Sequence, residues 1–128
     1  NYPKNLKMVF CSSIEKESEI LHLTSNHFQH DAVLLQNWRL WQQQNPVSAI
    51  SARNQILAAI KFRLPINKPQ QPILIVTSTA DRLVDHRCSQ QLAQHWQTSY
   101  QHHETAGHDL PLDEPEWLVK TITKWLNR

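Results

Sequence analysis

The chain has 128 residues, of which 40% are apolar, and a formal net charge of +2. This length fits one small domain, and charges of both signs are interspersed, so nothing resembles the basic stripe that binds nucleic acid. The longest apolar runs cover only a few residues, whereas a membrane-spanning helix needs about 20. We therefore expect neither a nucleic-acid partner nor a membrane span.

Two rare residue types carry more information than these averages. The cysteines, Cys11 and Cys88, are too few for a disulfide framework and lie among apolar residues, which predicts buried, reduced thiols and a cytoplasmic protein. Gly107 is the single glycine, although globular proteins contain about 7% glycine. Because α/β enzymes need glycines at tight turns, we expect this chain to be a piece of a longer protein.

The first half of the chain predicts one strand and two helices. Residues 6–11 ("LKMVFC") form a short apolar run typical of a strand, and a polar stretch predicted to be irregular follows. Asp31 is placed to cap a helix over "AVLLQNWRLWQQQ". A second helix begins near Ser48, and Pro65 stops it before a proline-rich connector.

The second half predicts alternating strands and helices. Residues 73–77 ("ILIVT") are apolar without alternation, as in a parallel strand buried on both faces, and residues 99–104 ("SYQHHE") form a weaker strand. One helix starts near Asp85, and a capping box of Asp113 with Glu116 opens the last helix. The expected buried faces of these two helices are Cys88, Leu92, Ala93 and Trp96 in the first and Leu118, Ile122, Trp125 and Leu126 in the second.

This order of elements predicts an α/β fold. We expect a partial three-stranded parallel sheet with flanking helices and an inserted helical cap. The chain would then be a single partial domain in which residues 1–11 hold a strand, residues 12–68 the cap and connector, and residues 69–128 the core.

An acidic residue and a histidine follow the two C-terminal strands. Asp81 lies just past residues 73–77, and His108 lies past residues 99–104, where Gly107 would allow a sharp turn. Ligands of open α/β sheets bind beyond the carboxyl ends of the strands, so both side chains emerge at one edge. We expect the carboxylate and the imidazole to lie within hydrogen-bond reach, as in a charge-relay pair.

The stretch from residue 73 to the C-terminus resembles the C-terminal half of the α/β-hydrolase superfamily. "ILIVTSTADRLV" matches that family's acid strand and loop, and "ETAGHDLPLDEPEWLVKTITKWL" matches its histidine loop and closing helix. "NPVSAISARNQILAAIKFRLP" is similar to part of a family cap domain, and "LKMVFC" to the strand before the cap. The resemblance implies a serine hydrolase, esterase-like or lipase-like, in which Asp81 orients His108 and no cofactor is needed.

The chain departs from the family in two places. Ser78 stands three residues before the acid, where the family usually has glycine, and a chain with one glycine cannot contain the nucleophile elbow G-x-S-x-G. We expect the serine and the oxyanion hole in a preceding segment. Trp38 and Trp41 share one helix face and either pack in the core or line an acyl pocket, so they are candidate substrate-binding residues.

Other readings of the same residues remain open. Asp85 is a rival acid that is better explained as a helix cap, and Asp109 adjoins the histidine too closely to orient its ring. An internal nucleophile would be sought in "VFCSS", at Cys11, Ser12 or Ser13. Eight histidines suggest a metal site, and two groups of three could supply its ligands: His22, His27 and His30, or His102, His103 and His108. Neither group has the spacing of a known metal-binding motif, so we expect no metal. Of the strand histidines, His102 is expected to face inward and His103 outward.

Two classes of function remain. In the first, the parent protein hydrolyses a small-molecule ester or related acyl substrate, and this chain alone is inactive. In the second, the chain is a non-catalytic interaction domain with a vestigial Asp81 and His108. In either case an open edge at residues 6–11 would favour a homodimer in which first strands or cap helices meet.

Overall fold

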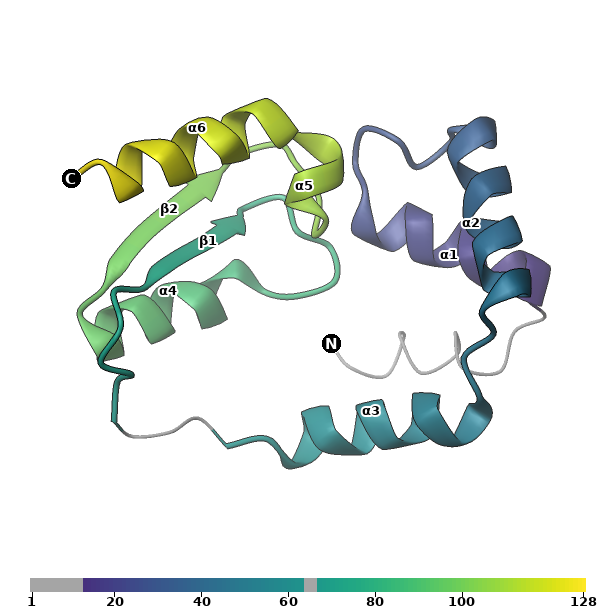
Figure 1. Ribbon diagram of the computed structural model, residues 1–128, viewed down its shortest axis with the longest axis horizontal. Coiled ribbons are helices and arrows are strands. Elements are labelled where there is room, and N and C mark those ends of the chain that lie inside the picture. The colour runs from purple at the N-terminus through teal and green to yellow at the C-terminus, as the bar shows by residue number, and fades with distance from the viewer. Residues whose placement is uncertain (1–12, 64–66) are drawn as a thin grey trace. The chain divides into compact units, whose positions relative to one another are not determined.

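The structure is a computed structural model that describes residues 13–63 and 67–128 (Figure 1). The chain divides into two compact units, one of residues 1–20 and 30–66 and the other of residues 21–29 and 67–128. Residues 21–29, which the sequence pattern assigns to the cap region, therefore group with the C-terminal core.

Three helices precede the first strand. The helix α1 (Ser13–Thr24) occupies the stretch that we expected to be irregular. That expectation was wrong because the segment, although polar, lacks proline and glycine and is rich in Glu and Leu, which favour helix. The helices α2 (Ala32–Gln44) and α3 (Ala49–Lys61) confirm the other two predictions.

Asp31 caps α2 as predicted, and α3 begins next to Ser48, close to its predicted start. The Asp31 carboxylate accepts the main-chain N–H of Leu34 at 2.8 Å, and the Ser48 hydroxyl accepts that of Ser51 at 3.1 Å. Each bond satisfies a donor that the first helical turn leaves free. The helix α3 has an exposed apolar stripe, in which Ile50 is 68%, Leu57 40% and Ile60 58% exposed.

A two-stranded parallel sheet organises the C-terminal unit. The strand β1 (Leu74–Ser78) pairs with β2 (Ser99–His103), so that Leu74 lies opposite Ser99 and Ser78 opposite His103. The mixed α/β class is confirmed, but the described residues contain two strands, not three. The expected third strand, residues 6–11, lies outside the described residues.

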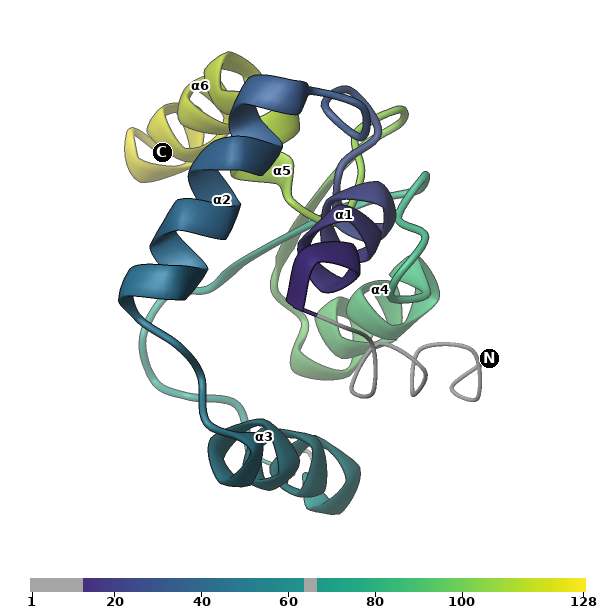
Figure 2. The ribbon, with the colours of Figure 1, turned by 90° about the vertical axis from the view of Figure 1, so that its right-hand side faces the viewer.

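Helices cover both faces of this sheet. Figures 1 and 2 show α4 (His86–Trp96) on one face and α6 (Pro115–Leu126) on the other, with the short α5 (Leu110–Asp113) before α6. Asp85 caps α4 as predicted, by accepting the Arg87 N–H at 2.9 Å, and a hydrogen bond from the Arg87 guanidinium holds the Asp85 pKa well below its ordinary value. No helix in residues 13–63 and 67–128 is long and apolar enough to cross a membrane.

The last helix does not begin as expected. The predicted capping box is wrong, because Asp113 ends α5 and turns its carboxylate inward, and Glu114 precedes α6 without a side-chain cap bond. Pro115 stands in the first turn of α6, where its missing N–H costs nothing.

Two of the expected buried faces are only partly correct. In α4, Ala93 is buried, but Cys88 is exposed, so the prediction of a buried thiol is wrong for this cysteine; Cys11 lies outside the described residues. In α6, Ile122 and Leu126 are 39% and 67% exposed. A two-stranded sheet offers each helix too narrow a surface to bury its whole apolar stripe.

The strand histidines also face the opposite way from the prediction. His102 is exposed, whereas the ring of His103 packs edge-on against Trp117 at 5.0 Å between centroids. The strand begins at Ser99, where it was predicted, so the error concerns which face is covered and not the register. Burial along β2 does not alternate, because Ser99, Tyr100 and His103 are half-buried and Gln101 and His102 are exposed, so the local pattern could not identify the face that Trp117 of α6 covers.

Candidate functional site

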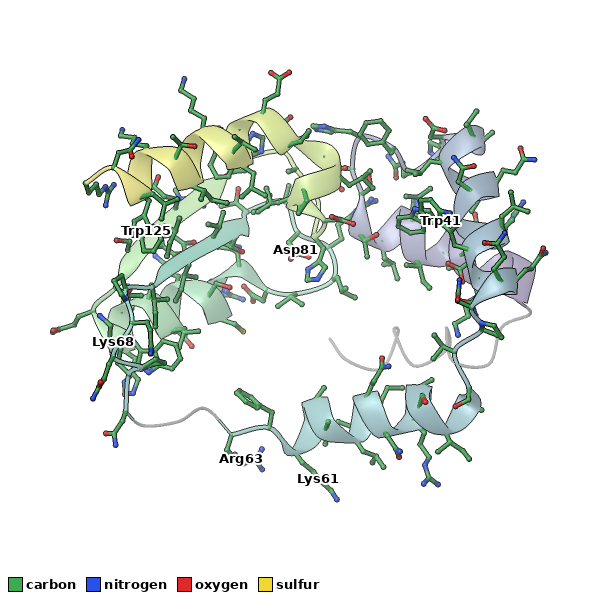
Figure 3. The ribbon with its side chains drawn as sticks, viewed as in Figure 1. Trp41, Lys61, Arg63, Lys68, Asp81 and Trp125 are labelled. Carbon is green, nitrogen blue, oxygen red and sulfur yellow. The ribbon has the colours of Figure 1, made fainter. Side chains whose placement is uncertain are left out.

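Asp81 lies in the loop beyond the end of β1 (Figure 3). Its side chain is 7% exposed, and its Oδ1 atom accepts the main-chain N–H groups of Leu83 at 2.8 Å and Val84 at 2.9 Å. These two bonds form a small turn that orients the carboxylate. They leave Oδ2 available to a second partner.

His108 supplies that partner from the loop beyond β2. Its Nδ1 atom lies 2.8 Å from Asp81 Oδ2, so the contact predicted from the order of the strands is present. A carboxylate only accepts hydrogen bonds, and therefore Nδ1 carries the proton and Nε2 of the neutral ring keeps its lone pair. The imidazole is 42% exposed, while its acidic partner is covered.

Hydrogen bonds also join the segments at the ends of the two strands. The Ser78 hydroxyl donates to the carbonyl of Ala106 at 2.5 Å, and the Thr79 N–H donates to the carbonyl of His103 at 2.9 Å. Ser78 is the last residue of β1. Its side chain therefore ties the end of β1 to the turn that carries the histidine.

A segment that the sequence analysis did not connect with Asp81 or His108 makes hydrogen bonds to both of their loops. This clasp, residues 21–29, belongs to the same compact unit as both loops. The Arg82 guanidinium, next to the acid, donates to the carbonyls of His22 and Ser25, the latter at 2.7 Å. No local pattern could have revealed these contacts, because the partners lie 57 or more residues apart.

Asp113 joins the clasp to the histidine turn. Its Oδ2 atom accepts the N–H groups of Gly107 at 2.6 Å and Asn26 at 2.8 Å, and its Oδ1 atom accepts the Ser25 hydroxyl. Burial by itself raises the pKa of Asp113, but the hydrogen bonds from these donors outweigh it and hold that pKa below its ordinary value. The interior of the unit thus contains a carboxylate that favours its ionised form.

Gly107 is needed for a reason other than the one predicted. Its φ angle is not positive, so the turn does not require glycine on conformational grounds. A Cβ atom at this position would lie 2.5 Å from the carbonyl oxygen of Thr24 and 3.0 Å from the main-chain nitrogen of Asn26. The absence of a side chain lets the clasp approach the turn before His108.

The remaining candidate residues lie elsewhere. Trp38 is half-buried and Trp41 is 58% exposed on α2, in the other unit, and their role as substrate contacts stays a prediction. Cys11 and Ser12 lie outside the described residues, and Ser13 is the first residue of α1. Within residues 13–63 and 67–128, no group of three or more histidine, cysteine or acidic side chains could hold a metal ion.

No protein-family model and no curated protein matches the chain.

Replacing Gly107 by Ala tests the close approach of the clasp. The new methyl group would overlap the Thr24 carbonyl oxygen, so we expect Gly107→Ala to lower the free energy of unfolding by about 1–3 kcal/mol, measured by urea denaturation. Thr105→Ala, an exposed change in the same turn, should stay within about 0.5 kcal/mol of the original protein. Equal stability of the two variants would contradict this account.

Replacing Asp113 by Asn tests the buried carboxylate. An amide cannot accept all of the donors that converge here, so the free energy of unfolding should fall by about 1–3 kcal/mol at neutral pH. Because the folded-state pKa of Asp113 is below its unfolded value, its contribution is complete above about pH 4 and is lost as the pH falls through the folded value. Urea denaturation from pH 7 to pH 3 should therefore show less acid destabilisation in the variant.

A matched control is Asp85→Asn. The pKa of Asp85 is also lowered, but its partner Arg87 lies in solvent and asparagine caps helices as well as aspartate does. This variant should retain the acid response of the original protein. A response to acid that is the same in Asp113→Asn and in the unsubstituted chain would show that this carboxylate has no special role.

Proposed function

We propose that this chain supplies the acid and the histidine of a Ser–His–Asp triad in a serine hydrolase of the α/β-hydrolase superfamily. The observation that supports the proposal is the 2.8 Å contact between Asp81 and His108 beyond the carboxyl ends of two parallel strands, with the acid earlier in the chain than the histidine. The substrate class would be a small-molecule ester or a related acyl compound.

In this reaction the two ring nitrogens of His108 have separate tasks. Asp81 accepts the Nδ1 proton and thereby leaves Nε2 free to take the proton of an attacking serine hydroxyl. The serine oxygen then bonds to the acyl carbon, and the imidazolium returns its proton to the departing alkoxide. Asp81 stays ionised throughout and stabilises the imidazolium.

The nucleophile would come from a part of the parent protein that this sequence does not include. The two buried serines near the pair are engaged in other bonds, Ser25 with the Asp113 carboxylate and Ser78 with the Ala106 carbonyl. With Gly107 as the single glycine, the sequence contains no G-x-S-x-G elbow. The proposal therefore assigns the attack to a serine upstream of this chain.

A second candidate function is a non-catalytic interaction domain. The observation that favours it is the apolar stripe of α3, in which Ile50, Leu57 and Ile60 recur at intervals of seven and three residues on one helix face and are all exposed. In that case the Asp81 and His108 pair would serve only the local structure.

Substitution of the pair in the parent protein separates these functions. His108→Ala and Asp81→Asn should each lower kcat/KM for a p-nitrophenyl ester by roughly 10²–10⁴-fold, because each removes part of the general base. The 128-residue chain alone should show no turnover above background and no labelling by a serine-directed phosphonate.

Three outcomes would contradict the hydrolase proposal. They are full activity of the His108→Ala parent, a parent sequence without an upstream nucleophile elbow, and phosphonate labelling of Ser12 or Ser13 in the isolated chain. His102→Ala serves as the matched control, since it removes an exposed imidazole from the adjoining strand and should leave the parent's rate unchanged.

We also propose that the chain forms a homodimer through the exposed stripe of α3. Burying apolar side chains stabilises an interface by about 25 cal/mol per Å², so sedimentation at micromolar concentration should show a dimer. Ile60→Lys should shift the protein toward the monomer, whereas Gln55→Lys, which adds the same charge away from the stripe, should not. A monomer at every concentration would contradict the proposal.

A further inference from the structure

One side chain of the clasp contacts both loops of the Asp81 and His108 pair. The side-chain nitrogen of Asn26 donates to the carbonyl of Ala80 at 3.1 Å and to the carbonyl of Thr105 at 2.9 Å. Ala80 directly precedes Asp81, and Thr105 lies three residues before the histidine. An amide NH₂ group has two hydrogens, so each loop receives one of them.

Asn26 is itself held in place by the buried carboxylate. Its main-chain N–H donates to Asp113 Oδ2 at 2.8 Å, and the same oxygen accepts the N–H of Gly107 at 2.6 Å. The N–H of Asp109 donates to the carbonyl of Thr24 at 2.8 Å. The residues on both sides of His108 are therefore bonded to the clasp or to the carboxylate that anchors it.

We propose that Asn26 is a positioning residue that sets the separation of Asp81 and His108. The inference rests on the proposed function in one respect, since a fixed separation matters to catalysis only if the pair is a triad. Asn26 touches neither the imidazole nor the Asp81 carboxylate, so it acts through the two main-chain carbonyls. The bridge holds the two loops at a spacing at which Nδ1 of His108 donates its hydrogen bond to Asp81 Oδ2.

Asparagine is suited to this position for a chemical reason. Two carbonyl oxygens face its amide nitrogen, and only a side chain with two donors on one atom can satisfy both from a short stem. Aspartate has the same shape but would bring an acceptor against those two acceptors. Asn26→Asp therefore converts an attractive bridge into a repulsive contact with almost no change in volume.

The test follows the position of the proton on His108 in the 128-residue chain. A free neutral imidazole favours the proton on Nε2, whereas a bond to Asp81 keeps it on Nδ1. Ring ¹⁵N chemical shifts at alkaline pH should show a single Nδ1–H form in the original protein. In Asn26→Asp the ring should shift to a mixture of both forms, because the loops separate.

Gln29→Glu is the matched control. It makes the same amide-to-carboxylate change in the clasp. Its side-chain oxygen accepts from Arg82 at 3.3 Å and its side-chain nitrogen donates to the main-chain carbonyl of Asn26 at 3.4 Å, so neither atom contacts the two loop carbonyls. This variant should retain the Nδ1–H form. A folded Asn26→Asp chain that also retains it, with an unchanged circular dichroism spectrum, would overturn the proposal.

Two further measurements decide the matter if Asn26→Asp does not fold. Asn26→Ser removes the bridge without adding charge and should also give a mixture of ring forms. In the original protein, scalar couplings across the hydrogen bonds should link the Asn26 side-chain amide to the carbonyl carbons of Ala80 and Thr105, and their absence would overturn the bridge itself.

Activity provides a separate readout. In the parent protein Asn26→Ser should lower kcat about 10–100-fold while KM stays nearly constant, because the pair is misplaced but the substrate still binds. If His108→Ala leaves the parent active, the hydrolase proposal fails while the ring-form experiment still reports on Asn26. If His108→Ala inactivates the parent but the Asn26 variants change neither the ring form of His108 nor kcat, the hydrolase proposal stands and only the positioning role of Asn26 is wrong.

Discussion

The buried carboxylate of Asp113 is the group on which the rest of the C-terminal unit depends. Removing a carboxylate from water is costly unless hydrogen-bond donors replace the lost solvent. Here the donors come from the clasp at Ser25 and Asn26 and from the histidine turn at Gly107, which are far apart in the sequence. The charge can be buried only if all of them converge, so the clasp and the turn are structurally coupled.

This coupling explains why so small a sheet can carry an ordered pair of side chains. Two parallel strands bring Asp81 and His108 to the same edge, but strands alone leave the loops beyond them free to separate. The Ser78 hydroxyl joins the end of β1 to the carbonyl of Ala106, and the Asn26 side chain joins the carbonyls of Ala80 and Thr105. The geometry of the pair therefore depends on polar contacts more than on apolar packing.

The two members of the pair also differ in their environment. Asp81 is covered and receives two main-chain N–H groups, whereas the His108 ring remains open to solvent. The acid is thus fixed by its hydrogen bonds, while part of the imidazole surface stays in solvent. The same two residue types on an exposed helix surface would lack this difference.

The sequence by itself determined the features that depend on near neighbours or on strand order. The caps at Asp31, Ser48 and Asp85 join residues two or three positions apart, so such contacts lie within a local pattern. The apolar run at residues 73–77 correctly located β1, although its apolar side chains are half-buried and not buried on both faces as expected, because the described sheet has only two strands. The contact of Asp81 with His108 was predictable because parallel strands end at one edge.

Only the tertiary structure decided what the polar residues outside those patterns do. A capping-box pattern at Asp113 was overruled because its carboxylate binds donors 87 and 88 residues away, and the helix α1 was hidden by its polar composition. The need for Gly107 came from the approach of the Thr24 carbonyl, not from a local turn. Such contacts between distant segments leave no local periodicity, so no reading of neighbouring residues could have revealed them.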